Sequence, residues 1–484
     1  MGGGFAGVCP RRAAPFGKPP WRALELRTPR PRPAKRPAAP ASSAPQPSAA
    51  GLPPRRAALT LLVQVLRERR SLAELMARTG ADTTLARLDE RERALTFMIL
   101  LTCLRRLGQI DAALRKIYSK GIPARGGELK DILRIAAAQI LFLQVPAHAA
   151  VDLAVRLANQ DPKARHFTGL ANAGLRRLAE RAGALLAEKD ETRINTPRWL
   201  WASWVETYGE KAAHDIGAAH LVEPALDLTV KANAGTWAEK LGARLLPTGT
   251  LRLAHKGPVE QLEGFAEGAW WVQDAAAALP ARLLGDVAGR TVIDLCAAPG
   301  GKTAQLAAAG ARVVAVEKSP RRARRLAENL RRLRLDAEII VADALDWTPG
   351  EPADAVLLDA PCTATGTIRR HPDAAWLKLA KDRDTLVPLQ RALLARAITM
   401  VRPGGLLVYA TCSLLSEEGE NQTDALLASG APVRRDPVAP EELPALKGAI
   451  TAKGELRTLP SMLPDPDPQL AGLDGFFAAR LIRL

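Results

Sequence analysis

The sequence predicts an α/β protein in which a doubly wound, mainly parallel sheet follows an all-helical domain. From Thr291 onward, short buried apolar runs alternate with helical patterns, a spacing typical of parallel sheets covered by helices. Residues 52–185 show apolar residues at helical spacing only. The 484 residues leave room for about three folded units. A membrane-spanning protein is excluded because the sequence lacks an apolar run of the ~20 residues that cross a bilayer.

Positive charge is concentrated in the N-terminal part of the chain. Residues 1–51 carry nine Lys or Arg against one acid, residues 52–185 carry 23 against 12, and residues 186–484 carry 36 against 38. This asymmetry favours a protein whose N-terminal part binds a polyanion while its C-terminal part carries out the chemistry. An arginine surplus set by genome composition would produce the same distribution of charge. Residues 1–51 are rich in Pro, Ala and Arg and cannot bury a core, so we expect them to be disordered.

The cysteines are scattered and form no CxxC pair; they are Cys9, Cys103, Cys296, Cys362 and Cys412. No histidine stands at metal-ligand spacing beside them, so we expect no structural zinc site. The N-terminus lacks the apolar core of a signal peptide. We therefore expect reduced thiols in a cytoplasmic protein.

The helical domain is predicted over residues 52–185. Asp89 and Glu92 form a capping box, and the apolar residues after them keep a helical stripe. A second helix is expected over Glu128–Leu143, and a third begins after Pro146.

Residues 191–290 are predicted to form a small α+β module. One amphipathic helix carries three tryptophans that we interpret as core residues, Trp199, Trp201 and Trp204. Alternating runs at Leu226–Val230 and Leu251–Leu253 indicate strands.

The domain over residues 291–484 contains the alternating elements. Its expected strands are Thr291–Ala297, Arg312–Glu317, Ala337–Asp343, Ala353–Ala360 and Gly405–Thr411. Helices are expected over Pro320–Arg334, whose many arginines we interpret as a solvated face, and near Asp382–Val401. Ligands of such sheets bind beyond the carboxyl ends of the strands, where the candidate functional residues stand.

The first strand leads through a glycine-rich turn into a helix at Lys302. Gly300 and Gly301 allow the backbone to approach a ligand closely, and free N–H groups at the start of the helix suit a carboxylate. The turn has neither P-loop nor GxGxxG spacing. Glu317, after the second strand, is placed to accept both hydroxyls of a ribose, and Asp343, after the third, to accept an adenine amino group. An acid for the ribose without a pyrophosphate loop favours S-adenosylmethionine over NAD.

Two cysteines follow neighbouring strands. Cys362 follows the fourth strand and Cys412 the fifth. Adjacent strands lie about 4.8 Å apart, so we expect both thiols to face one pocket, with Asp359 between them and the cofactor. One such cysteine would be interpreted as a buried structural thiol. A pair beside a methyl donor suits thiolate addition to C6 of cytosine, which makes C5 nucleophilic, while a carboxyl group near N3 and N4 stabilises charge on the ring.

At these residues the sequence closely resembles the RNA cytosine-5 methyltransferases, in particular the bacterial Sun/Fmu (B) type that acts on 16S ribosomal RNA. The matching stretches are DLCAAPGGKT, VEKSPRR, DAPCTATGTIRRHPD, VRPGGLLVYATCS, Glu417–Asn421 and DGFFAARL. The helical part resembles NusB, an RNA-binding fold. The resemblance implies a Rossmann-like class I methyltransferase domain behind a NusB-like domain. Where the family often has Ser-Gly, this chain has Thr363-Ala364, which puts the local turn in doubt.

The resemblance also implies a role for each site residue. Cys412 would be the nucleophile that bonds to C6, Cys362 would assist product release, and Asp359 would complete the catalytic set. The implied S-adenosylmethionine site comprises Cys296, Ala297, Ala298, Pro299, Gly300, Gly301, Lys302, Glu317, Asp343 and Asp359, and no metal is implied.

We therefore expect a monomeric cytoplasmic enzyme that methylates C5 of a cytidine in 16S ribosomal RNA, of the cytosine-967 type, through a Cys–C6 adduct. Its partner would be small-subunit ribosomal RNA. Two alternatives stay open: a cytosine-5 methyltransferase that acts on tRNA or on another rRNA site, and a non-catalytic RNA-binding assembly factor.

Overall fold

The computed structural model of this protein describes residues 51–76, 85–187, 190–254 and 257–484. All of the elements below belong to the compact unit Ala49–Leu484. Apart from Gly51, the segment predicted to be disordered lies outside the described residues, and so does Cys9.

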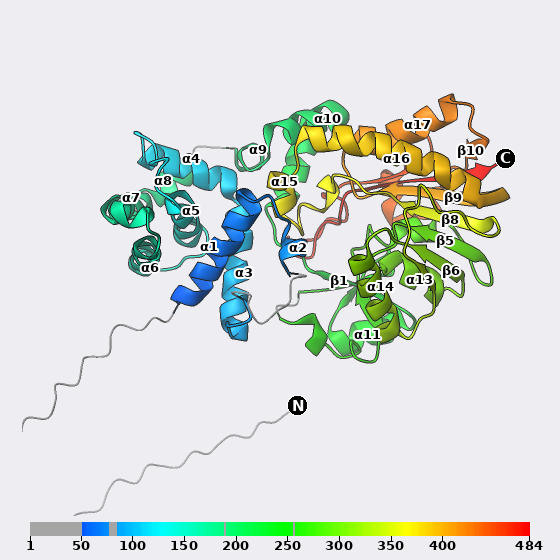
Figure 1. The fold of residues 1–484 in the computed structure, drawn as a ribbon, viewed down its shortest axis with the longest axis horizontal. Coiled ribbons are helices and arrows are strands. Elements are labelled where there is room, and N and C mark those ends of the chain that lie inside the picture. The colour runs from blue at the N-terminus through cyan, green and yellow to red at the C-terminus, as the bar shows by residue number, and fades with distance from the viewer. Residues whose placement is uncertain (1–50, 77–84, 188–189, 255–256) are drawn as a thin grey trace, which may run out of the picture. The chain divides into compact units, whose positions relative to one another are not determined.

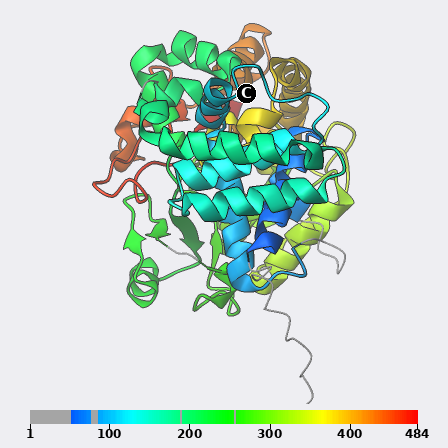
Figure 2. The same cartoon turned by 90° about the vertical axis from the view of Figure 1, so that its left-hand side faces the viewer.

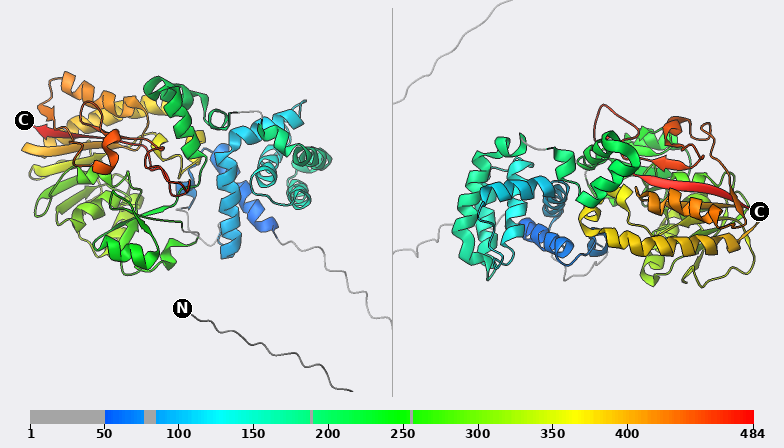
Figure 3. Two further views of the ribbon diagram at one scale, coloured as in Figure 1. Left: turned by 180° about the vertical axis from the view of Figure 1, so that it is seen from behind. Right: turned by 90° about the horizontal axis from the view of Figure 1, so that it is seen from above.

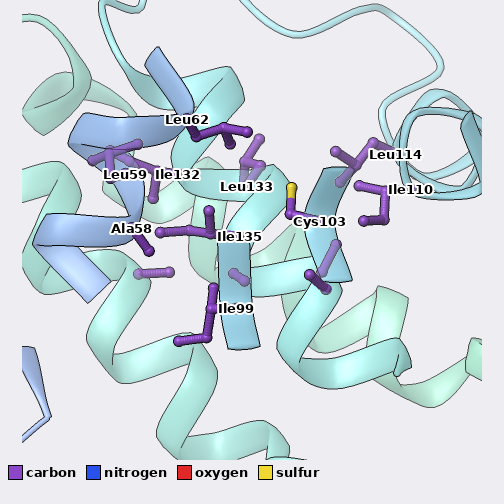
Figure 4. Close-up of a cluster of buried hydrophobic side chains, with 14 of the residues drawn as sticks. Ala58, Leu59, Leu62, Ile99, Cys103, Ile110, Leu114, Ile132, Leu133 and Ile135 are labelled. Atoms are coloured by element: carbon purple, nitrogen blue, oxygen red, sulfur yellow. The ribbon is translucent and has the colours of Figure 1, made fainter. Parts of the chain in front are cut away.

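A bundle of helices comes first in the chain, as predicted (Figures 1 and 2). Its elements are α1 (Leu52–Leu66), α2 (Leu72–Met76), α3 (Glu90–Arg105), α4 (Leu107–Ile117), α5 (Leu129–Leu141), α6 (Ala147–Gln160), the 3-10 turn η1 (Ala164–Phe167), α7 (Thr168–Glu180) and α8 (Ala182–Ala187). The predicted capping box is confirmed, because Glu92 N donates to Asp89 Oδ1 at 2.8 Å and Asp89 N donates to Glu92 Oε2 at 3.2 Å. The apolar faces meet in one core that includes Leu62 and Ile99 (Figure 4). Cys103 is part of this core, and burial raises the pKa of its thiol.

A helical segment and a small antiparallel sheet follow. Their elements are α9 (Glu191–Ile194), α10 (Arg198–His220), β1 (Leu226–Val230), α11 (Ala234–Leu241), β2 (Arg244–Leu245), β3 (Leu251–Leu253), η2 (Val259–Gln261), β4 (Trp270–Val272) and α12 (Leu279–Arg282). The strand order is β2-β3-β1-β4, and both predicted strands are present with the predicted bounds. Trp201 and Trp204 are buried core residues, as predicted, whereas Trp199 is only partly buried.

The C-terminal part holds an eight-stranded mixed sheet (Figure 3). Its strands are β5 (Thr291–Leu295), β6 (Arg312–Val316), β7 (Glu338–Ile340), β8 (Ala353–Asp359), β9 (Val401–Thr411), β10 (Val433–Arg435), β11 (Leu456–Thr458) and β12 (Phe476–Arg483). The other elements are α13 (Gly301–Ala308), α14 (Pro320–Leu333), η3 (Thr365–Thr367), α15 (Asp373–Leu377), α16 (Ala380–Met400), η4 (Ser416–Glu418), α17 (Glu420–Ala428) and η5 (Pro444–Ala449). The strand order is β10-β12-β9-β8-β5-β6-β7, with β11 paired to β12. Strands β5 to β9 pair in parallel, so the predicted doubly wound, mainly parallel sheet is confirmed.

Helices cover the two faces of this sheet. Successive residues of a strand point to opposite faces, so Val292 of β5 packs in a cluster with Leu306 of α13, whereas Ile293 packs in another with Leu394 of α16. Because β5, β6, β8 and β9 run parallel, their carboxyl ends meet at one edge of the sheet. The residues predicted to be functional follow these strand ends.

The structure differs from the predicted strands in four main respects. β9 begins at Val401, four residues before the predicted Gly405, directly after α16 ends at Met400. β5 ends at Leu295 because Cys296 adopts a left-handed backbone, with φ at 61°. β7 is limited to Glu338–Ile340, and its pairing with β6 ends where Glu317 N donates to Ile340 O at 3.0 Å. Our prediction also omits β10, β11 and β12, which extend the sheet beyond β9 in the antiparallel sense.

Candidate active site

The turn after β5 is held rigidly against α14. Gly300 adopts φ at 103°, and a Cβ at this position would lie 2.3 Å from Leu326 Cδ1, so the turn requires glycine here. Asn329 Nδ2 donates to Pro299 O at 2.8 Å, and the Arg322 guanidinium donates to Ala298 O. The turn therefore presents a fixed backbone to a ligand.

Glu317 and Asp343 follow β6 and β7 at the same edge. Glu317 is 3% exposed, and its carboxylate accepts from Ser319 N at 2.9 Å and from Ala298 N at 3.3 Å. Glu317 thereby joins the end of β6 to the turn after β5. Asp343 accepts from Lys318 Nζ at 2.6 Å, and this hydrogen bond lowers the pKa of the Asp343 carboxyl. Both side chains thus place carboxylate oxygens at this edge of the sheet.

Asp294 is a buried acid that the sequence analysis did not select. Its Oδ2 accepts from Thr303 Oγ1 at 2.6 Å, which ties β5 to α13. Its Oδ1 is buried and has no hydrogen-bond partner among the described residues. Burial raises the pKa of Asp294 to about 7. The motif contains this residue, but only the fold shows that it is enclosed.

Lys302 and Asp359 form an ion pair between the turn and the end of β8. Lys302 Nζ lies 2.7 Å from Asp359 Oδ2 and 5.1 Å from the centre of the Phe476 ring. Burial lowers the pKa of Lys302, but the negative charge of Asp359 outweighs it, and Cys412 adds to the effect, so the pKa is raised overall. The lysine is thus a buried cation shared by the carboxylate and the nearby thiol.

Cys362 and Cys412 lie side by side, as the strand order predicts. β8 pairs with β9, and the two Sγ atoms are 3.4 Å apart. The hydrogen bond with Cys412, together with burial, raises the pKa of Cys362 well above its ordinary value. Cys362 is therefore a protonated thiol near neutral pH. Cys296 is not part of this pair, and burial raises the pKa of its thiol to about 12.

Glu418 holds the two cysteine-bearing segments together. Its carboxylate accepts from Thr363 N at 2.9 Å, from the Thr363 hydroxyl, and from Gln390 Nε2 at 3.0 Å. Its backbone O accepts from Tyr409 OH at 2.7 Å and from Thr411 Oγ1 at 3.2 Å. Thr363 follows Cys362 and Thr411 precedes Cys412, so this one fully buried residue contacts a neighbour of each thiol.

The motif at residues 369–373 has a structural role. Arg369 is buried and pairs with Asp274 at 2.9 Å and with Asp474 at 3.2 Å. Asp373 accepts from Leu72 N at 2.9 Å, which connects this segment to the helical bundle. The motif therefore joins parts of the fold and leaves Arg369 inaccessible to a large ligand.

Three further observations concern the described part of the chain. None of its helices is long and apolar enough to span a membrane. The described ranges contain no group of three or more His, Cys, Asp or Glu side chains that would hold a metal ion. The four described cysteines are free thiols.

The predicted site residues thus gather at one edge of the sheet. The turn over residues 296–302 lies beside Glu317, and Lys302 connects it to Asp359 and the paired thiols. Asp343 stands one strand further out, paired with Lys318. The arrangement offers a backbone cradle and two acids to a polar cofactor, next to a thiol pair that suits covalent attack on an electrophilic carbon.

Comparison with known proteins assigns both parts of the chain. Residues 281–482 match the 16S rRNA methyltransferase RsmB/F family, and residues 52–180 match the NusB family. Ribosomal RNA small subunit methyltransferase B of Sodalis glossinidius is 34% identical over 441 residues, which cover 87% of this chain and 96% of that protein. The protein of the same name from Pseudomonas putida is 35% identical over 453 residues, 89% of this chain and 98% of its own. The crystal structure of PH0851 shares the fold, with a TM-score of 0.68 and 24% identity over 89% of this chain and 99% of that one.

Proposed function

This chain belongs to the ribosomal RNA small subunit methyltransferase B family, which comprises S-adenosylmethionine-dependent RNA methyltransferases, and we propose that it methylates C5 of a cytidine in 16S ribosomal RNA through a covalent cysteine adduct. The observation that carries this proposal is the pair of thiols, whose Sγ atoms lie 3.4 Å apart at the ends of adjacent strands. A methyltransferase that attacks a nitrogen or oxygen atom has no need of two thiols, whereas C5 of cytosine reacts only after a thiolate has added to C6.

Residues of the turn and the neighbouring strand ends hold S-adenosylmethionine in this proposal. The cofactor supplies an electrophilic methyl group on a sulfonium. Glu317 would accept from the ribose hydroxyls, Asp343 would accept from the adenine amino group, and the N–H groups at the start of α13 would donate to the methionine carboxylate. The buried, unpartnered Oδ1 of Asp294 and the missing Cβ of Gly300 fit a polar ligand that lies close to this backbone.

Cys412 is the nucleophile and Cys362 acts afterwards. The Cys412 thiolate bonds to C6, and the electron pair of the C5–C6 double bond moves to C5, which then takes the methyl group while the donor's sulfur–methyl bond breaks and leaves a neutral thioether. A base removes the C5 proton, the C5–C6 double bond re-forms, and the C6–sulfur bond breaks to release the thiolate. Two features support this order: the raised pKa keeps Cys362 protonated, and the Lys302 ammonium lies where it attracts a negative charge on Cys412. Asp359 hydrogen-bonds near N3 and N4 while charge develops on the ring.

The substrate position is of the cytosine-967 type, and the reaction takes place in the cytoplasm, where ribosomal RNA is made. The test is a map of 5-methylcytidine in 16S ribosomal RNA and tRNA from a deletion strain, complemented with wild type or with Cys412→Ser. One 16S position should lose the modification, regain it with wild type and stay unmethylated with the variant. Loss of a tRNA modification instead would assign the enzyme to tRNA, and an unchanged map would leave an RNA-binding factor.

A further inference from the structure

Helix α14 carries an unusual concentration of arginine on its exposed side. The segment from Pro320 to Arg334 contains seven arginines and one acid, Glu328. Six of these arginines are exposed; apart from Arg322, which pairs with Glu317, they are Arg321, Arg324, Arg325, Arg331 and Arg334. We call these five the α14 arginine face. Because residues 186–484 as a whole carry a slight negative charge, this face is a local exception.

The remaining two arginines of the segment have structural partners. The Arg322 guanidinium donates to Ala298 O and lies 3.3 Å from Glu317 Oε2. Arg332 Nη1 donates to Phe265 O at 2.8 Å, and its guanidinium lies 4.1 Å from the centre of the Phe265 ring.

By contrast, the five guanidinium groups of the α14 arginine face make no hydrogen bond or ion pair with any residue in the described ranges. Positive charge also gathers at the end of the helix, where Lys231 Nζ donates to Leu333 O at 2.6 Å. Burial and the neighbouring cations Arg334 and Arg332 lower the pKa of Lys231. The fold thus uses two arginines and leaves five available to a partner.

The chemistry of the face identifies its partner as a phosphate backbone. All five cations are arginines, whose planar guanidinium groups bind phosphate oxygens in bidentate fashion. The apolar residues of α14, such as Leu326 and Leu330, are buried against the sheet, so the helix has no apolar face to insert into a membrane. A membrane surface therefore fits less well than a nucleic acid.

The α14 arginine face is also close to the turn over residues 296–302, which we call the cofactor turn. α14 starts three residues after Glu317, and Leu326 and Asn329 contact the turn at Gly300 and Pro299. Figure 1 shows α13 and α14 side by side in front of the sheet. A polyanion on the outer side of α14 is therefore separated from the cofactor turn by the thickness of one helix.

We propose that the α14 arginine face binds the phosphate backbone of the substrate RNA, as a second contact surface besides the basic helical domain. This inference rests on the proposed function for the identity of the RNA. The face contributes affinity and position without sequence selectivity, since phosphate contacts carry no base information.

The test uses the full-length protein with Arg321, Arg324, Arg325 and Arg331 all changed to Gln. Glutamine keeps helix propensity and removes the charge, and none of the four touches the cofactor turn. The control variant changes four exposed cations elsewhere to Gln, Arg198, Lys381, Arg391 and Lys447. Both variants are checked for thermal stability and for S-adenosylmethionine affinity, which should match wild type.

Binding of an unmodified 16S ribosomal RNA transcript is then measured over a range of salt concentrations. Each lost phosphate contact lowers the slope of log affinity against log salt by about 0.7–0.9, so the α14 variant should lose about three in slope and bind at least about tenfold more weakly at low salt. The control variant should keep a slope close to wild type. An unchanged slope in the α14 variant, or an equal loss in the control, overturns the proposal.

The same samples separate this proposal from the proposed function. If wild type methylates the transcript and the α14 variant keeps the wild-type salt slope, the proposal for the α14 arginine face is refuted and the proposed function stands. If wild type binds the transcript without methylating it and the α14 variant has a reduced salt slope, the proposed function is refuted and the proposal for the α14 arginine face is supported. Anionic lipid vesicles bound by wild type but not by the α14 variant, with RNA affinity unaltered, would assign the face to a membrane instead.

Discussion

Replacing Glu317 by Gln tests the cofactor site at a buried residue whose two carboxylate oxygens both accept from backbone N–H groups. Its Oε1 accepts from Ser319 N at 2.9 Å and its Oε2 from Ala298 N at 3.3 Å. Oε2 also lies 3.3 Å from Arg322 Nη1, so Oε1 is the oxygen that keeps a lone pair for a ribose hydroxyl. In glutamine, one oxygen becomes an NH₂ group, and in either orientation that group faces a backbone N–H donor. The variant therefore loses at least one charge-assisted hydrogen bond to the cofactor.

The expected loss follows from that single bond. A hydrogen bond to a charged group contributes about 1.5–3 kcal/mol, so Glu317→Gln should weaken S-adenosylmethionine binding roughly tenfold to 150-fold in calorimetry. Glu338→Gln is the matched control, because Glu338 is exposed on the neighbouring strand β7. Its affinity should equal that of wild type, and RNA binding should be unaltered in both variants.

An analogue of S-adenosylmethionine without the ribose 2′-hydroxyl makes the test specific. Wild type should bind this analogue more weakly than the normal cofactor, whereas Glu317→Gln should show a much smaller difference between the two ligands. Full cofactor affinity in Glu317→Gln, or an equal penalty for the analogue in both proteins, would refute the assignment of Glu317 to the ribose.

Three further perturbations test the surroundings of the site. Gly300→Ala should lose about 1–2 kcal/mol of unfolding free energy because of its positive φ, and about 1–3 kcal/mol more because its Cβ would collide with Leu326 Cδ1. Gly310 has φ at 84° but more space around it, so Gly310→Ala should show only the first loss in urea titrations. Asp294 has a pKa of about 7 in the folded chain against an ordinary 3.8, so the protonated form favours folding and stability falls as pH rises from about 4 to 7. Asp294→Asn should remove that dependence, which amounts to as much as about 4 kcal/mol, and an unaltered pH profile of unfolding would contradict it. Glu418→Gln should lower methyl transfer and slow the diamide-driven closure of a disulfide between the two site thiols, while an unchanged closure rate would show that Glu418 does not position them.

Residues that follow strand ends were predictable because strand pattern and position in the sheet are linked. Apolar runs located β5, β6, β8 and β9, and a parallel sheet brings their carboxyl ends together. Cys362 and Cys412 therefore had to be neighbours once β8 and β9 were adjacent. The doubtful turn is also resolved, because Ala364 adopts φ at 57° in place of a glycine.

Residues whose role depends on a returning loop were not predictable. Glu418 lies 55 positions from Thr363, and only the path of the chain after β9 turns its carboxylate back toward that residue. Asp294 looks like a strand-end acid in the sequence, and its enclosure depends on the packing of α13. Arg369 stands in a stretch that matches the family, and nothing near it in the sequence shows that it is buried between two aspartates from distant segments. No local pattern encodes such contacts.

The most direct test of the covalent mechanism is the fate of the RNA on Cys362→Ala. If Cys362 acts after methyl transfer, this variant should add to C6, transfer the methyl group and then stall. A slower band that RNase removes should then appear on a denaturing gel, with 5-methylcytidine in the trapped RNA. Cys412→Ser and the double variant should give no band, because a serine hydroxyl is far less ionised than a thiol near neutral pH. A band that persists without Cys412, or one formed by Cys412→Ser alone, would contradict the assigned roles.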